Sequence, residues 1–86
     1  MNTTVTEIAT DFALGLDDDK RAPVIALGKK IDERIEDANA AGAPALLALA
    51  DALWDEGMQK ITDTGDTTAM DLAMAGCIRC LQLADT

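Results

Sequence analysis

Three short breaks rich in glycine, proline and aspartate constrain the fold of this chain more than any other feature. They lie at residues 15–19, 42–44 and 63–66. Between them, apolar residues recur at intervals of three and four, which is the spacing of one face of an α-helix. No segment shows the alternating pattern of a β-strand. The sequence therefore predicts four helices separated by short turns.

The first two helices have recognisable start signals. Thr4 can cap the first helix while Glu7 completes a capping box, and we expect this helix to end within residues 15–17. Acidic residues and Pro23 fit the opening turn of the second helix, at about residues 19–41. The expected core face of the first helix is Val5, Ile8, Phe12 and Leu16, and that of the second is Val24, Leu27, Gly28, Ile31, Ile35 and Ala38.

The third helix, at about residues 44–62, has a wider apolar surface than one packing contact needs. Its core seam is Leu46, Leu49, Ala50, Leu53 and Gly57. A second row beside the seam is Leu47, Trp54, Met58 and Ile61. This second row either packs on a neighbouring helix or stays exposed as a contact surface.

The fourth helix begins with Asp66 or Thr67 as its cap and ends at about Leu83. It is apolar on most sides, and its thin polar strip is Asp71, Arg79 and Gln82. A helix this apolar is normally enclosed on several sides, and two short neighbours cannot supply that cover. We therefore expect another chain to bury part of the third and fourth helices.

These patterns predict an all-α fold, a small antiparallel bundle of four helices, with residues 1–86 forming a single helical domain. A hydrophobic content of 49% supports a folded core. A domain of this size nevertheless buries only about 60 to 65% of the surface that its unfolded chain exposes. Since the two cysteines allow at most one disulfide, we expect self-association, as a homodimer, to add support.

The charge of the chain limits its partners. Acidic residues outnumber basic ones by 16 to 7, which gives a net charge of −9. Such a field repels nucleic acid and anionic lipid and favours basic protein surfaces. The first 20 residues carry Glu7 and Asp11 and lack the basic start of a signal peptide. We expect a cytoplasmic protein that binds a basic protein partner, with no direct nucleic-acid or membrane contact.

Most catalytic side chains are missing from the sequence. It contains no Ser, His or Tyr. There is thus no serine nucleophile, no attachment site for phosphopantetheine, and no histidine to move protons near neutral pH. Neither of the glycine-rich phosphate-binding motifs occurs. We expect a protein that is not an enzyme and has no cofactor.

Cys77 and Cys80 form a CxxC spacing that places both sulfurs on one helix face. A zinc site needs about four ligands, and the chain offers no His and no second CxxC. A thioredoxin-like site needs its first cysteine at a helix start, whereas Cys77 lies well inside the fourth helix. Both cysteines are expected to be small hydrophobes of the core, with a metal or redox role as the alternative.

An exposed second row on the third helix would be the most specific contact surface. Trp and Met provide much contact area, and carboxylates border the row. The candidate partner-binding residues are the anchors Leu47, Trp54 and Met58 and the acidic residues Asp51, Asp55, Asp32 and Glu36, with Glu56 as a further part of the rim. Lys30 and Arg34 occupy the opposite flank from Asp32 and Glu36. The alternative for these acidic residues is ordinary solvated helix surface.

Three functions are compatible with these features. The first is a small acidic protein-binding module, a regulator or inhibitor that occupies a basic surface of a target, in one version a nucleic-acid-binding surface. The second is a structural or scaffolding homodimer that uses the third and fourth helices. The third, and least favoured, is a metal or redox protein built on the CxxC spacing.

Overall fold

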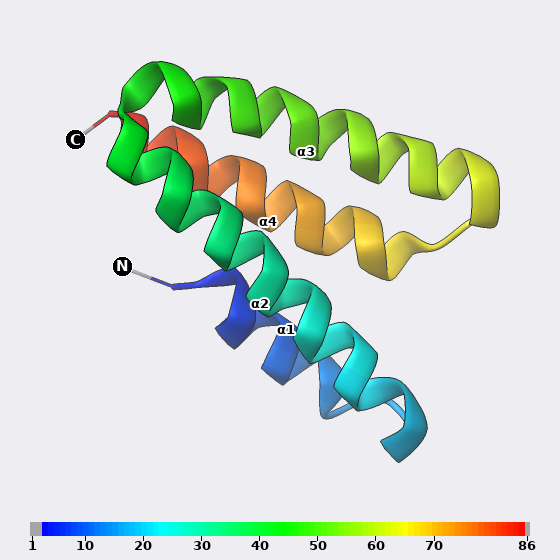
Figure 1. Ribbon diagram of the computed structural model, residues 1–86. Coiled ribbons are helices and arrows are strands. Elements are labelled where there is room, and N and C mark those ends of the chain that lie inside the picture. Colours follow the sequence, from blue (N-terminus) through cyan, green and yellow to red (C-terminus); the bar gives the residue numbers. More distant parts are fainter. Residues whose placement is uncertain (1–2, 86) are drawn as a thin grey trace.

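The computed structural model describes residues 3–85, which form four α-helices joined by short connections (Figure 1). They are α1 (Val5–Ala13), α2 (Asp18–Ala41), α3 (Ala43–Thr64) and α4 (Thr67–Ala84). The part of the chain that is described contains no strand. The predicted all-helical fold is confirmed, and the limits of α2, α3 and α4 lie within two residues of those expected.

Local caps account for these limits. The Thr4 hydroxyl accepts a hydrogen bond from the Glu7 amide at 3.1 Å, as expected for the start of α1. An Asp66 carboxylate oxygen accepts from the amide three residues later at the start of α4. Gly42 and Gly65 end α2 and α3 with φ angles of 118° and 70°, which other residues rarely adopt.

Three expectations for the first half of the chain are wrong. α1 ends at Ala13 and not within residues 15–17. Pro23 lies in the second turn of α2 and not in its opening turn, so it removes a hydrogen bond near an exposed helix start. In addition, the expected core face of α1 is only partly right: Val5 is buried and Ile8 packs against the core, but Phe12 is 37% exposed and the small residues Ala9 and Ala13 are buried instead. The reason is a close approach to α2: a methyl group on Gly28 would lie only 2.6 Å from the Ala9 Cβ.

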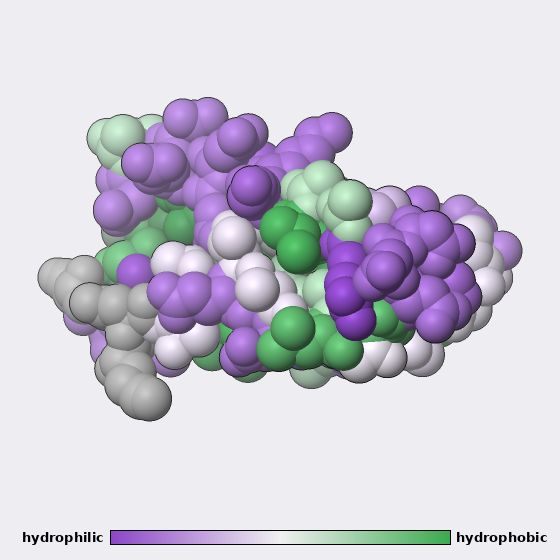
Figure 2. Space-filling view, turned by 90° about the horizontal axis from the view of Figure 1, so that it is seen from below, coloured by the Kyte–Doolittle hydropathy of each residue, from purple (hydrophilic) through white to green (hydrophobic). Residues whose placement is uncertain are grey.

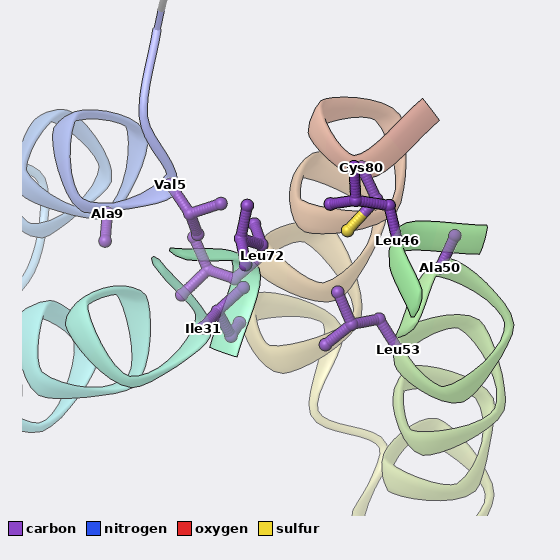
Figure 3. Packing of buried hydrophobic residues seen from close by; sticks show 9 residues of the cluster. Val5, Ala9, Ile31, Leu46, Ala50, Leu53, Leu72 and Cys80 are labelled. Carbon is purple, nitrogen blue, oxygen red and sulfur yellow. The ribbon is translucent and has the colours of Figure 1, made fainter. Parts of the chain in front are cut away.

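All four helices contribute to one buried cluster (Figure 3). Its members are Val5, Ala9, Ile31, Ile35, Leu46, Ala50, Leu53, Leu72 and Cys80. The predicted core face of α2 and the predicted seam of α3 both take part in it or pack against it. Hydrophobic burial in this cluster therefore holds the helices together.

The helices form two close pairs, α1 with α2 and α3 with α4, and α2 crosses the second pair (Figure 1). A bundle-like fold is thus observed, while the antiparallel order of neighbouring helices stays a prediction. Hydrophilic residues cover much of the face seen in Figure 2, and hydrophobic residues break through between them. Among residues 3–85, no helix combines the length and apolarity needed to cross a membrane.

Candidate functional site

The predicted second row on α3 is exposed. Leu47, Trp54 and Met58 have 45 to 49% of their surface accessible, and Ile61 lies at the end of the same row. The neighbouring seam of α3 is buried, with Leu46 and Leu53 almost fully enclosed. Large apolar side chains are therefore available on the side of α3 that the core does not use.

A matching exposed row runs along α4. Met74, Ile78 and Leu81 have 37 to 52% of their surface accessible. Sequence reasoning predicted that α4 is too apolar to be covered within one chain, but it did not separate these three residues from the buried ones. Their intervals of four and three residues were the available signal, because residues at that spacing share one helix face.

Neighbouring contacts show which way the α3 row points. Glu56 faces α2, because it pairs with Arg34, and Gly57 faces α4, where an added methyl group would lie 2.7 Å from the Met70 sulfur. Each residue of a helix is rotated by about 100° from the one before. Met58 therefore lies a further 100° round, on the side of the α3–α4 pair that faces away from α2.

The α4 row lies on the same side of the α3–α4 pair. Gly76 faces α2, since an added methyl group would lie 2.7 Å from Ile31 Cγ2, and Ala73 faces Gly57 of α3. Met74 lies about 100° beyond Ala73 and away from Gly76. We call the shared side of α3 and α4 the outer face; its apolar residues are Leu47, Trp54, Met58, Ile61, Met74, Ile78 and Leu81.

The charges on the outer face have one sign. By the same rotation, the exposed carboxylates of Asp51, Asp55, Asp71 and Asp85 lie on or beside it. Five of the seven basic residues are Lys20, Arg21, Lys29, Lys30 and Arg34, all on α2. Lys60 lines a hollow of about 350 Å³ between α2, α3 and α4. Arg79 lines two other hollows, one with Asp32 and Glu36 and one with Ile78 at the edge of the outer face nearest α1. Among residues 3–85, the outer face is thus apolar with an acidic rim, and the cation nearest to it is Arg79 at its α1 edge.

Asp32 has a different position and a structural role. One carboxylate oxygen accepts from the Val5 amide at 3.0 Å, and the other accepts from the Thr6 amide at 2.7 Å and from the Thr6 hydroxyl. These are donors at the first turn of α1, which the α1 helix itself cannot satisfy. Asp32 therefore caps α1 from α2, a contact between residues 26 and 27 positions apart that no local pattern reveals.

Glu36 is exposed one turn after Asp32. Both residues line a shallow hollow with side chains of α1 and α4, on the other side of the molecule from the outer face. The structure thus brings Leu47, Trp54 and Met58 together with Asp51 and Asp55, but it does not bring Asp32 or Glu36 to that surface.

Glu56 is turned toward α2 and away from the outer face. Its two carboxylate oxygens accept from the two terminal nitrogens of Arg34, each at 2.8 Å. This paired hydrogen bond raises the pKa of Arg34 and lowers the pKa of Glu56. The pair links α2 to α3, so Glu56 leaves the rim that the sequence suggested.

The CxxC cysteines lie in or against the core. Cys80 is fully buried beside Leu46 (Figure 3), and Cys77 is partly buried against the same cluster. Burial, followed by the charge of Cys77, raises the pKa of the Cys80 thiol, which keeps it protonated. Within residues 3–85, no three His, Cys, Asp or Glu side chains are grouped to hold a metal ion. This environment favours packing over thiolate chemistry.

Comparisons with protein-family models, curated proteins and solved structures found no match for this chain.

Proposed function

We propose that this protein is a small acidic binding module that regulates or inhibits a target protein by docking on a basic surface of it. One observation carries this proposal: in the described part of the chain, the outer face combines two exposed apolar rows with a rim of carboxylates, and its nearest cation is Arg79 at one edge. Apolar anchors supply contact area, and a rim of one charge selects partners of the opposite charge.

The energetics favour a basic partner over contact by hydrophobicity alone. Covering the exposed half of an anchor such as Trp54 gains about 1 kcal/mol, so the whole outer face gains about 7 kcal/mol. Association itself costs about 4 to 15 kcal/mol. The free energy gained by covering the apolar rows is therefore about equal to the cost of association. Complementary charge then decides which proteins bind.

A homodimer is the second candidate, because the same exposed rows could cover each other. The charges weigh against it. Two copies joined by the outer face would bring eight carboxylates together, four from each copy, while the nearest described cation of each copy, Arg79, lies at the edge of that face. Self-association and the antiparallel order of the helices stay predictions of the sequence, and we place the basic partner first.

The finer features of the proposal follow from the sequence. The net charge of −9 suits a target whose basic surface binds nucleic acid in the absence of this protein. The two free cysteines fit a cytoplasmic location, where thiols stay reduced. We propose no catalysis, because the chain lacks Ser and His and its Cys80 thiol is buried.

Co-purification with matched variants tests the proposal. The tagged protein is purified from its native host as wild type, as Leu47→Asp and as Leu14→Asp. Leu14 is also exposed, at 70%, but lies beyond the end of α1 and off the outer face. We expect a basic protein that is retained by the wild type and by Leu14→Asp and is lost from Leu47→Asp.

The purified target is then titrated at increasing ionic strength. Association that slows steeply as salt rises is expected, since screening weakens attraction between separated charges. Salt-insensitive association, or equal loss of the target from both variants, would refute the proposal.

A further inference from the structure

The outer face has the residue spacing of a coiled-coil seam on both of its helices. These two seams are exposed rows and are distinct from the buried core seam of α3. On α3, the seam is Leu47, Asp51, Trp54, Met58 and Ile61, at intervals of four and three. On α4, it is Asp71, Met74, Ile78, Leu81 and Asp85, at intervals of three and four. Such seams normally receive the side chains of another helix. Here both are exposed.

The two seams lie side by side in a fixed register. Gly57 packs against Met70, and Gly76 packs against Leu53. As the residue number rises along α3, the number of the facing residue on α4 therefore falls by about the same amount. That register places Trp54 level with Met74, and Leu47 level with Leu81. The missing side chains of the two glycines let α3 and α4 approach closely, so the two seams together form one track along the outer face.

The dimensions of this track suit one further helix. The α3 seam from Leu47 to Ile61 extends over about 21 Å, at about 1.5 Å per residue. A helix of about three heptads has the length to contact the whole seam. A helix that lies over the line between the two seams contacts both, as in a three-helix bundle.

Asp51 determines the charge of that helix. It lies within the α3 seam, between Leu47 and Trp54, so a partner that covers the seam also covers its carboxylate. A carboxylate removed from water needs a cation nearby. The described residues of a second copy offer only Arg79, at the edge of the outer face and outside its seams. A helix with one Lys or Arg among its seam residues places a cation within the seam.

We propose that the partner element bound by the outer face is a single amphipathic α-helix of basic character. Its apolar seam lies on Trp54, Met58 and Met74, one of its cations pairs with Asp51, and flanking Lys or Arg residues face Asp55, Asp71 and Asp85. This inference rests on the proposed function, and it specifies which part of a target the protein binds.

Synthetic peptides test the inference directly. The first is a 21-residue peptide without Trp, blocked at both ends, with Leu along one heptad seam, one Lys within the seam and Lys on both flanks. The second has the same composition in an order that spreads Leu around the helix. The third has Glu in place of every Lys. Trp54 is the only tryptophan of the protein, so its emission reports contact at the outer face.

We expect the first peptide to shift the emission of Trp54 to shorter wavelength and to bind at least about tenfold more tightly than the other two. Asp51→Lys should weaken this binding by about tenfold or more. Glu33→Lys makes the same charge change on an exposed position of α2 and should weaken it by less than about threefold. Circular dichroism checks that both variants fold. If Asp51→Lys does not fold, Asp51→Asn is used in its place.

Two results would overturn the inference. One is binding of the first peptide that is no tighter than that of the scrambled peptide. The other is a concentration-dependent dimer of the free protein that already shields Trp54, because a second copy would then occupy the track. If the peptides fail while Leu47→Asp still abolishes capture of a basic target, the proposed function stands and only the helical nature of the contact is wrong.

Discussion

Replacing Asp32 with alanine should loosen or unfold α1. The change removes the acceptor of two backbone hydrogen bonds, from Val5 at 3.0 Å and Thr6 at 2.7 Å, together with one from the Thr6 hydroxyl. The residue Val5 is fully buried, so water cannot readily take over at its amide. The sequence suggested a partner contact for Asp32, whereas this geometry predicts a stability defect.

The expected size of the effect follows from these contacts. Loss of a helix cap costs about 1 to 2 kcal/mol, and hydrogen bonds to a charged group contribute about 1.5 to 3 kcal/mol each when they are shielded from water. Since the site is only partly buried, we expect a total loss of about 2 to 4 kcal/mol. For a domain of this size, that corresponds to a fall in melting temperature of at least about 8 °C.

Urea and thermal denaturation followed by circular dichroism measure this loss. Glu36→Ala is the matched control, because it removes an exposed carboxylate one turn away and should change stability by less than about 0.5 kcal/mol. Hydrogen exchange should show faster exchange at the start of α1 in Asp32→Ala. Equal stability of the two variants would refute the capping role of Asp32.

Three further predictions concern the core and the link between α2 and α3. Because Arg34 lowers the pKa of Glu56, the pair stabilises the fold above the ordinary pKa of glutamate and loses this effect as the pH falls through the lowered value. Glu56→Gln should therefore lower the free energy of unfolding by less than about 1 kcal/mol at neutral pH, because the pair is partly exposed, and should not change it in strong acid. Urea titrations at both pH values measure this. Gly28→Ala should destabilise the protein in thermal unfolding, because the added methyl group would lie 2.6 Å from the Ala9 Cβ and 3.1 Å from a backbone oxygen. Overpacking costs about 1 to 3 kcal/mol, and better helix propensity offsets about 1 kcal/mol of this cost. A higher melting temperature would contradict the close contact. The Cys80 thiol should react with a disulfide reagent at least about a hundredfold faster in denaturant than in the native protein, and equal rates would show that it is accessible.

The helices could be predicted because their start and stop signals are local. Thr4 and Asp66 cap through their own side chains, and Gly42 ends α2 through its backbone. α1 ends earlier than its sequence predicts, for a reason outside the local sequence. Arg21 of α2 donates to the carbonyl oxygen of Ala13, at 3.0 Å, and to another carbonyl in the turn, so a tertiary contact fixes where α1 stops.

The candidate surface could be predicted in part. The α3 row is visible in the sequence because Leu47, Trp54 and Met58 follow a helical interval next to a second apolar seam. Which carboxylates belong to it could not be derived, because Asp32 and Glu56 are each engaged by residues more than 20 positions away. Helix periodicity assigns residues to a face of their own helix, but only packing shows which helix lies opposite.

Quenching of Trp54 fluorescence by acrylamide, in the free protein and in its complex with the captured target, tests the central claim most directly. The outer face should be open before binding and covered after it. We therefore expect Trp54 to be quenched readily in the free protein at all concentrations, and to be shielded with blue-shifted emission in the complex. Equal quenching in both states, with the target bound, would show that the partner docks elsewhere and would contradict the assignment of this face.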